Sequence, residues 1–486
     1  MMSKRMSRRQ FLSLTAIAGT GAGFLWGLSS EANSSANKKP NIIFVMLDDM
    51  GYGDLSLYGQ KRIRMPNIEQ MAREGIRFTQ VYSGATICAP ARSTLMTGQH
   101  TGRTTVRGNW GDLKQGAVPC SGGSGPRVPL KDDDVTIAEV LKDAGYATGI
   151  TGKWGLGEPD TSGLPNRQGF DEWFGYLNQH LAHSHYPEYL WDNRKKKKLK
   201  GNTGTTKNFA NQSHYSHDLF TDFAMDFIKR RGAGEAPFFL YVPYCLPHDS
   251  FQNPEIESYA YEAGWSKKEK VYASMLTRAD RDMGKMFSLL TEMDIDKDTI
   301  VFFCSDNGAA NRYEGTFNSS GKLRGKKRSM YDGGLRTVMV LRWPGRIKAG
   351  AVSDDIWYFP DVLPTCAELA GVAPPGNIDG VSVLPSILSQ PQPQLYSRPL
   401  YWEDHERGFR CAARKGNWKF VCNDVDKPPE VYNLSDDIGE EENLAESNPE
   451  LVKWFWDFVK ESHKPSANWP VPRLDKGEGE ISNRVL

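Results

Sequence analysis

The chain has 486 residues and a net charge of +1, from 60 lysines and arginines against 59 aspartates and glutamates. Its 39% hydrophobic content is that of an ordinary globular protein and excludes a coiled coil, a collagen-like chain or wholesale disorder. The balanced charge gives no reason to expect a nucleic-acid partner. Seven cysteines are too few for a scaffold held by disulfides, and the length fits one large domain or two unequal ones.

Residues 1–36 have the features of a signal peptide and are set apart from the fold. Basic residues precede an apolar stretch from Phe11 to Leu28, and small residues follow it up to Ser34-Ser35-Ala36. Ser7-Arg8-Arg9-Gln10-Phe11-Leu12 resembles the twin-arginine export signal of bacteria. The alternative is a membrane anchor, which the glycines of the apolar stretch disfavour. We expect a periplasmic or secreted protein that uses the twin-arginine export machinery and has no stable membrane anchor.

Four continuous apolar runs predict strands that are buried on both faces, as in a parallel sheet. They cover residues 41–47, 238–242, 299–304 and 337–341. Helical spacing of apolar residues follows Pro66 and Thr136, and these patterns end at Gly75 and Gly145. The alternation of helices and strands favours an α/β fold, with a mostly parallel central sheet covered by helices on both faces.

The chain changes character after Pro385, where Pro, Gln and Ser become frequent up to Pro399. Short strand-like runs at 409–413 and 418–421 and a helical pattern over 449–460 then follow. These patterns predict a smaller C-terminal α+β domain with a short antiparallel sheet. The predicted organisation is a signal peptide over 1–36, a large catalytic α/β domain over 40–390 and the smaller domain over 395–486.

Polar residues follow three of the predicted strands, at the edge where open α/β sheets bind ligands. They are Asp48, Asp49, His248, Asp306 and Asn307. Acids placed side by side after a buried strand need a positive charge to neutralise them. Three carboxylates and an amide suit calcium or magnesium, whereas the shortage of histidine speaks against zinc. We predict one divalent cation held by Asp48, Asp49, Asp306 and Asn307; the alternative is that each aspartate caps a helix or forms a turn.

Cys88 is the candidate nucleophile, in the sequence Cys88-Ala89-Pro90-Ala91-Arg92 before a predicted helix. A cysteine near a helix start, with an arginine one turn on, lies in electropositive surroundings that lower the pKa of a thiol. The alternative is a buried structural cysteine.

These motifs together resemble the type I sulfatase family of the alkaline phosphatase superfamily. Residues 88–92 match its Cys-x-Pro-x-Arg signature, and further segments resemble its other motifs in the family's order. These are residues 41–54, 152–157, 305–308, 323–336 and 431–445. The resemblance covers nearly all of residues 40–445.

The resemblance implies a sulfuric ester hydrolase in which a maturation enzyme converts Cys88 to formylglycine, whose hydrate attacks the sulfur of a sulfate monoester. Arg92 would hold the hydrate, and Lys153 would bridge the hydrate and the sulfate. His248 would contact the bridging oxygen and is the candidate general acid. Lys327, rather than its neighbour, matches the family lysine because it lies four residues before Tyr331. The implied metal is calcium, bound by the four predicted ligands together with the hydrate at residue 88.

One position departs from the family pattern. Most members carry a histidine two residues after the lysine that matches Lys153, and that histidine contacts the hydrate; here the position is Gly155. His180, His183 and His185 lie nearby in the sequence. We predict that His183 enters the pocket to bind sugar or to assist the leaving group; the alternative is a polar surface loop.

The expected substrate is a sulfated sugar, such as a galactose or N-acetylgalactosamine sulfate. Two alternatives stay open from the sequence. One is a phosphomonoesterase or phosphodiesterase of the same superfamily, and the other is a non-catalytic glycan-binding relative.

Overall fold

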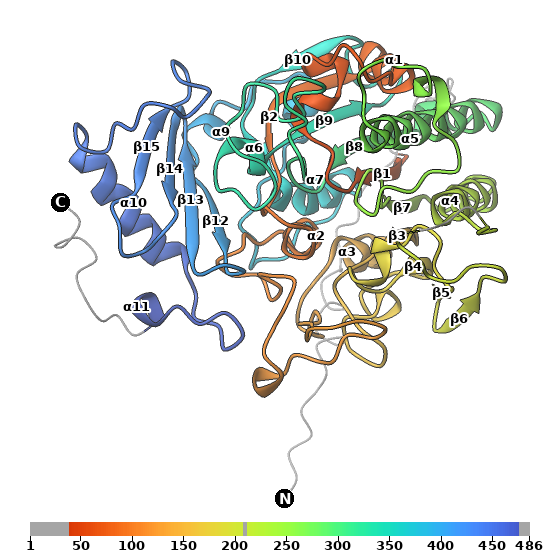
Figure 1. Cartoon of the computed structure of the whole chain (residues 1–486), viewed down its shortest axis with the longest axis horizontal. Helices are drawn as coiled ribbons and strands as arrows, with labels where there is room; N and C mark the ends of the chain where they lie inside the picture. The colour runs from red at the N-terminus through yellow and green to blue at the C-terminus, as the bar shows by residue number, and fades with distance from the viewer. Residues whose placement is uncertain (1–37, 208–210, 476–486) are drawn as a thin grey trace, which may run out of the picture. The chain divides into compact units, whose positions relative to one another are not determined.

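A computed structural model of the chain describes residues 38–207 and 211–475. The segment predicted as an export signal, residues 1–36, lies outside this part. Among the described residues, no helix is both long and apolar enough to cross a membrane. The described chain forms one large mixed sheet flanked by helices and a second sheet of four strands toward the C-terminus (Figure 1).

The large sheet is parallel at its centre, as the apolar runs predict. β1 (Asn41–Leu47) pairs in parallel with β7 (Phe238–Pro243) on one side and with β8 (Thr299–Ser305) on the other. All seven residues of β1 are buried. The full order is β10 (Ala351–Ser353), β2 (Ile76–Tyr82), β9 (Arg336–Arg342), β8, β1, β7, β3 (Ala147–Lys153), β4 (Glu172–Tyr176), β5 (Tyr189–Asp192) and β6 (Lys195–Lys198), with β11 (Trp357–Tyr358) also paired to β2. The prediction of a mostly parallel central sheet is confirmed.

Antiparallel pairs lie on both sides of this parallel centre. β9, the strand predicted over 337–341, runs antiparallel to both β8 and β2. The connection between Ser305 and Arg336 carries only the four-residue helix α6 (Asp332–Leu335). A parallel neighbour is usually reached through a crossover helix that packs on the sheet, whereas this connection has no long helix and joins two antiparallel strands.

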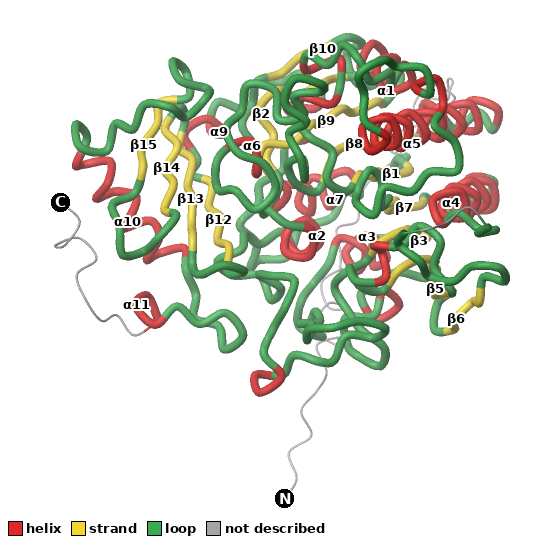
Figure 2. The backbone as a smooth tube through the Cα atoms, in the orientation of Figure 1, coloured by secondary structure: helices red, strands yellow, loops and turns green. Residues whose placement is uncertain are grey.

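Helices cover both faces of the large sheet (Figure 2). Successive side chains of β1 point to opposite faces, so Phe44 packs into one hydrophobic core and Val45 into the other. The first core includes residues of α2 (Cys88–Thr97), α3 (Ile137–Asp143) and α7 (Val362–Leu369). The second includes residues of α1 (Pro66–Glu74), α4 (Ser216–Gly232) and α5 (Lys267–Glu292).

Both predicted helices of the N-terminal half are present, as α1 and α3. α1 begins at Pro66, where the missing N–H of proline costs no hydrogen bond. α3 begins after Thr136, whose hydroxyl accepts a hydrogen bond from Glu139 N while the Glu139 carboxylate accepts one from Thr136 N. This reciprocal pair is a capping box, and it fixes where the helix starts.

The C-terminal region contains the predicted antiparallel sheet. Its order is β12 (Leu400–Asp404), β13 (Arg410–Lys415), β14 (Trp418–Cys422) and β15 (Glu430–Asn433). Helix α10 (Pro449–Ser462) packs on it, with the rings of Phe420 and Phe455 stacked 5.4 Å apart. Three short helices complete the description: α8 (Leu384–Ile387), α9 (Gln394–Ser397) and α11 (Pro472–Asp475). The domain boundaries given above stay predictions.

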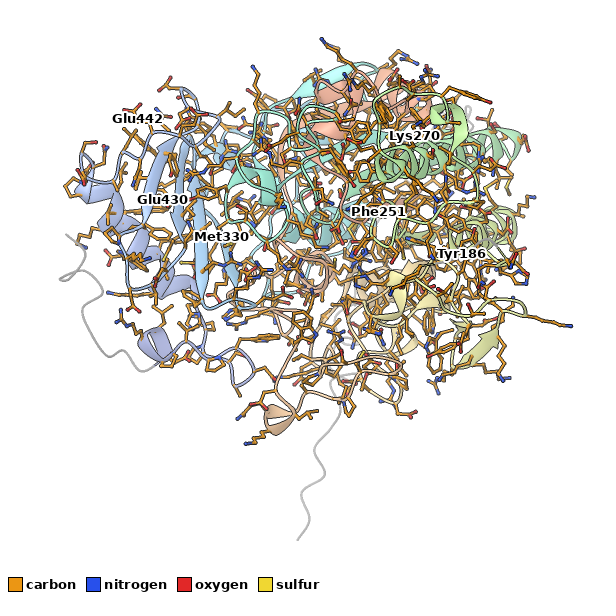
Figure 3. All side chains as sticks on the ribbon, viewed as in Figure 1. Tyr186, Phe251, Lys270, Met330, Glu430 and Glu442 are labelled. Atoms are coloured by element: carbon orange, nitrogen blue, oxygen red, sulfur yellow. The ribbon has the colours of Figure 1, made fainter. Side chains whose placement is uncertain are left out.

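A buried lysine ties this sheet to the segment before α6. Lys419 of β14 donates from Nζ to the Met330 carbonyl at 2.9 Å, and it pairs with Asp332 at 2.9 Å and Glu440 at 3.0 Å. Met330, labelled in Figure 3, packs against residues of β12 and β13. The C-terminal sheet therefore holds in place the segment that carries Lys327, three residues earlier.

Candidate active site

Six polar side chains lie at the carboxyl ends of four neighbouring parallel strands. Asp48 and Asp49 follow β1, Asp306 and Asn307 follow β8, Lys153 ends β3, and His248 lies in the loop after β7. All six are buried. They come from distant parts of the sequence and meet because parallel strands end at the same edge of the sheet. Asp49 leaves β1 with a left-handed backbone, φ 70°, which aspartate tolerates better than most residues.

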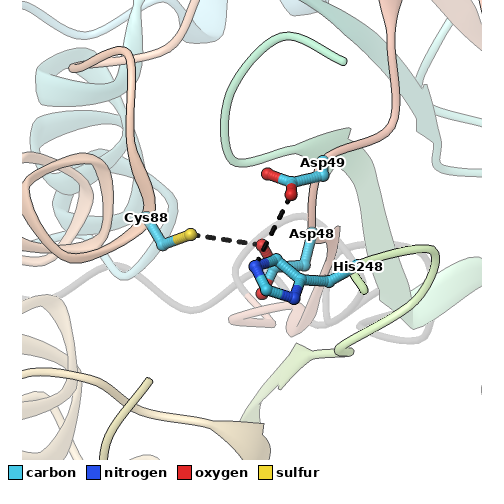
Figure 4. A group of neighbouring side chains, drawn as sticks. All are labelled: Asp48, Asp49, Cys88 and His248. Carbon is cyan, nitrogen blue, oxygen red and sulfur yellow. Dashed lines mark hydrogen bonds and ion pairs between the residues drawn. The ribbon is translucent and has the colours of Figure 1, made fainter. Parts of the chain in front are cut away.

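Cys88, the first residue of α2, faces this group (Figure 4). Its Sγ lies 3.3 Å from Asp48 Oδ1 and 3.5 Å from Lys327 Nζ. Ligand atoms of Asp48, Asp49, Cys88 and His248 all lie within 4.8 Å of one another. The structure therefore brings the predicted nucleophile next to two of the predicted metal ligands and to the predicted general acid.

Three cations pair with the three carboxylates. Lys153 Nζ lies 2.5 Å from Asp48 Oδ2, and Lys327 Nζ lies 2.6 Å from Asp49 Oδ1. Arg92 Nη2 lies 2.9 Å from Asp306 Oδ2 and 3.4 Å from Asp48 Oδ2. These six groups carry formal charges that sum to zero. A divalent cation added to them would make the centre positive, which suits an anionic ester.

The facing charges set the pKa values of the paired groups. Burial acts to raise the pKa of Asp48, but the charges of Lys153, Arg92 and Lys327 oppose it and hold that pKa well below its usual range. Burial and the charge of Asp48 together raise the pKa of Asp306 to about 7. The carboxylates outweigh burial at Lys153 and raise its pKa, so this lysine stays protonated.

The expectation of an activated thiolate at Cys88 is wrong for the unmodified residue. Burial, and after it the negative charge of Asp48, raise the pKa of the Cys88 thiol well above its ordinary value. The pattern of helix start and arginine suggested the opposite because it does not show burial or the facing carboxylate. An unmodified Cys88 is a neutral thiol and a weak nucleophile.

His248 is neutral at neutral pH in this site. Burial lowers the pKa of its imidazole to about 4. Its Nε2 lies 3.6 Å from Asp49 Oδ2, and its Nδ1 lies 3.1 Å from Asp249 Oδ1. The ring is held at the mouth of the centre, where it can meet the oxygen that links sulfur to a leaving group.

The four predicted metal ligands fit a hard divalent cation. Asn307 Nδ2 donates to Asp49 Oδ1 at 2.7 Å, which leaves Asn307 Oδ1 buried without a hydrogen-bond partner. An orphan amide oxygen beside Asp48, Asp49 and Asp306 is the donor set that calcium prefers. A buried acceptor of this kind needs an explanation, and a cation provides one.

A cavity of about 610 Å³ opens over Cys88. Cys88, Lys153, Lys327 and His248 line it on the inside. Five further cationic side chains line it: Arg127, Lys268, Lys326, Arg328 and Arg407. Among the described residues, Lys268, Lys326 and Arg407 form no ion pair with a carboxylate. The cavity is thus strongly cationic although the whole chain carries only +1.

The histidine-rich segment contributes to the same cavity. His183, in the short 3₁₀ turn Leu181–His183, lines the cavity with its ring 4.7 Å from that of His248. Its Nδ1 lies 3.5 Å from Asp249 Oδ1, and 43% of its side chain is exposed. His180 also lines the cavity, whereas His185 is buried and its Nε2 lies 3.1 Å from the His248 carbonyl oxygen.

Gln179 is a cavity residue that sequence reasoning missed. It precedes His180, and its side-chain amide lies beside Gly155. The histidines of the segment drew attention because their chemistry is distinctive, whereas a glutamine carries no comparable signal. The absence of a side chain at Gly155 was the only hint that some other group enters there.

The fold and the site define an α/β enzyme with a cationic pocket over one candidate nucleophile. A family model described as Sulfatase matches residues 40–372, and one described as N-sulphoglucosamine sulphohydrolase, C-terminal, matches residues 325–457. N-acetylgalactosamine-6-sulfatase from Canis lupus familiaris is 34% identical, covering 79% of this chain and 73% of that protein. Arylsulfatase A from Homo sapiens is 30% identical, with 88% of each chain covered. The chain therefore belongs to the sulfatase family and is a hydrolase of sulfate esters.

A solved structure agrees with this assignment. The crystal structure of Ps i-CgsB in complex with k-i-k-neocarrahexaose matches with a TM-score of 0.74 at 28% identity. The match covers 87% of this chain and 93% of that chain.

Proposed function

We propose that the protein releases inorganic sulfate from a sulfated sugar, such as a galactose or N-acetylgalactosamine sulfate. Residue 88 would be converted to formylglycine, and one calcium ion would be held by Asp48, Asp49, Asp306 and Asn307. The observation that carries the proposal is the position of Cys88, buried between a metal-type carboxylate group and Lys327 at the base of a cationic cavity.

The state of the thiol supports conversion of Cys88. A buried thiol with a raised pKa is a poor nucleophile. When present, the hydrate of formylglycine supplies the nucleophilic hydroxyl, and calcium polarises the sulfuryl oxygens.

The protein's own residues have separable tasks in this proposal. Lys153 and Lys327, both protonated, neutralise charge on the sulfate. Arg92, four residues after residue 88 in α2, holds the Asp48 and Asp306 carboxylates in place from 3.4 and 2.9 Å. Asp249 oxygens accept from His248 Nδ1, so Nε2 of the neutral ring carries no proton. An anionic substrate would favour the charged ring, whose Nε2 would then donate its proton to the leaving oxygen.

Two observations support a sugar as the carrier of the sulfate. The relatives include an enzyme named for N-acetylgalactosamine 6-sulfate and a structure with a bound neocarrahexaose. The unpaired Lys268, Lys326 and Arg407 at the cavity offer charge for further anionic groups of a glycan. His183, which lines the cavity beside His248, would contact the sugar.

The remaining partners are the twin-arginine export machinery and a formylglycine-generating enzyme, with the mature protein in the periplasm or secreted. Their support is the sequence of residues 1–36 and the Cys-x-Pro-x-Arg motif at Cys88.

The test is the mass of the peptide that contains residue 88, from protein exported by its own host. We expect an aldehyde mass, together with sulfate release from a panel of sulfated sugars. An unmodified cysteine with no sulfate release would contradict the proposal. Hydrolysis of phosphate esters in that case would favour the phosphoesterase alternative, and binding of glycans without hydrolysis would favour a non-catalytic relative.

A further inference from the structure

The side chain of Gln179 fills the space beside Gly155. A Cβ added to Gly155 would lie 2.4 Å from Gln179 Nε2, and Gly155 has φ +84°, a conformation that favours glycine. Gln179 Nε2 donates to the Gly155 carbonyl at 3.0 Å. Position 155 is therefore shaped to admit a side chain from elsewhere, and the amide of Gln179 is that group.

The hydrogen bond to Gly155 decides which way the amide points. A carbonyl oxygen only accepts, so Nε2 faces Gly155 and Oε1 faces away from it. Gln179 is 6% exposed and lines the cavity together with Cys88 and Lys153. Its Oε1 has no hydrogen-bond partner among residues 38–207 and 211–475. A buried acceptor in this state costs free energy until a donor reaches it.

A complementary group without a partner lies against the same position. Arg92 Nε is a fully buried donor that finds no hydrogen-bond acceptor within the described part of the chain. The Cβ position at Gly155 lies 3.7 Å from Arg92 Cδ, the carbon bonded to that nitrogen. A hydroxyl satisfies both groups because it donates to one and accepts from the other, whereas a sulfate oxygen only accepts.

We propose that Gln179 is a further active-site residue that holds the nucleophile. Its Oε1 accepts a hydrogen bond from one hydroxyl of the hydrated formylglycine at residue 88, and Arg92 Nε donates to the same hydroxyl. The inference rests on the proposed function. Arg92 lies one helical turn after residue 88, so both groups are on the same side of α2. The two hydrogen bonds fix the orientation of the hydrate and favour it over the free aldehyde.

The test compares Gln179→Met with Gln168→Met. Gln168 is also buried, with Nε2 bonded to backbone carbonyls and Oε1 unpartnered, but it does not line the cavity. The mass of the residue 88 peptide is measured first in each protein. An aminooxy probe then reports the free aldehyde by its labelling rate, and hydrolysis is followed with 4-nitrocatechol sulfate, which has no sugar hydroxyls.

We expect Gln179→Met to keep the aldehyde mass, to label faster, and to lose roughly tenfold in kcat with little change in KM. Gln168→Met should change only the thermal unfolding temperature. If Gln179→Met does not fold, Gln179→Ala, which leaves room for water, should show the same shifts. If a folded Gln179 variant labels and turns over at the wild-type rates, the inference is overturned while the proposed function stands. The same conclusion follows if the variant loses only the hydrolysis of sugar sulfates. Absence of aldehyde in the wild type would overturn the proposed function as well.

Discussion

Asp48 contacts three different groups at a position with no exposed surface. Its Oδ2 accepts from Lys153 and Arg92, and its Oδ1 lies against Cys88 Sγ. Buried charges of this kind are tolerated because each has partners of opposite sign. Loss of one partner leaves the other charge uncompensated and destabilises the folded protein by about 3–5 kcal/mol. The centre is therefore rigid by electrostatics as well as by packing.

Asn307→Leu should weaken divalent cation binding while the protein still folds. The substitution keeps the volume but deletes both the orphan Oδ1 and the hydrogen bond that orients Asp49. We expect calcium affinity and sulfate release to fall by about 10- to 100-fold. Calorimetric titration with calcium is the measurement. Asn253→Leu is the control, because Asn253 is also buried with an unpartnered Oδ1 but does not line the cavity. Equal calcium binding by both variants would contradict the metal assignment.

Lys327→Met and Lys326→Met separate two adjacent lysines. Lys327 Nζ touches Cys88 Sγ and Asp49, whereas Lys326 is exposed and forms no ion pair with any residue that the structure describes. Loss of the inner charge should lower kcat by about 10²–10³-fold. Loss of the outer charge should raise KM for an anionic sugar and leave kcat alone. The measurement is the steady-state kinetics of both variants on one sulfated sugar. If the two effects were reversed, Lys326 and not Lys327 would be the catalytic lysine.

At the scale of elements, a buried histidine fastens the C-terminal segment to the sheet. His463, just after α10, has Nδ1 2.7 Å from Glu403 Oε1 and Nε2 3.0 Å from Asp475 Oδ1. Two carboxylates on two ring nitrogens require both nitrogens to donate, so the ring is an imidazolium. Burial acts to lower the pKa of His463, but Glu403 and Asp475 outweigh it and raise that pKa above 6.5. Glu403 in turn has its pKa lowered to about 2, because His405, His463 and Arg107 outweigh its burial.

This contact predicts a pH dependence of stability. Because the pKa of His463 is raised in the folded state, its charge adds to the free energy of unfolding. This contribution is complete below about pH 6.5 and is lost as the pH rises through the pKa of His463 in the folded protein. The melting temperature of the wild type should therefore fall between pH 6 and pH 9 more than that of His463→Gln. His214→Gln, which alters a loop histidine with no ion pair in the described chain, should follow the wild type. Parallel curves for wild type and His463→Gln would refute the assignment of this charge.

At the scale of the whole molecule, cationic side chains are concentrated at one cavity of a nearly neutral chain. Lys268 comes from the first turn of α5, Lys326 from the segment before α6, and Arg407 from the loop between β12 and β13. Three separate parts of the fold, including the C-terminal sheet, thus supply charge to one opening. A cavity lined by one sign of charge concentrates ligands of the opposite sign.

Salt should weaken turnover of a polyanionic glycan more than turnover of a small aryl sulfate. Screening acts over about 8–10 Å at 0.10–0.15 M ionic strength, so it affects the outer cations more than the buried pairs. We expect kcat/KM for a multiply sulfated oligosaccharide to fall with added NaCl, and Arg407→Gln to flatten that slope. Lys198→Gln, on the exposed edge strand β6 away from the cavity, is the control. An unchanged slope in Arg407→Gln would remove this residue from substrate binding.

Much of the architecture was predictable from local pattern. The run Asn41–Leu47 is apolar without interruption because β1 has neighbours on both sides and a core on each face. The acids that follow β1 and β8 were expected to meet because parallel strands share one edge, and the structure places Asp49 N 3.2 Å from Asp306 Oδ1. The direction of β9 was not predictable, because an apolar run reads the same in either direction.

The sequence by itself determined four strands of the large sheet, the two-faced core and the identity of the groups at the strand ends, since these follow from hydrophobic period and chain direction. Only the tertiary structure decided that Gln179 fills the space at Gly155, that the Cys88 thiol is neutral, and that Arg407 reaches the cavity. The physical reason is that burial, facing charge and the room around a side chain depend on segments that are separate in the sequence, such as Gln179 and Gly155, 24 residues apart, and Cys88 and Asp48, 40 residues apart. A local sequence pattern does not show which of these segments come together in the folded chain.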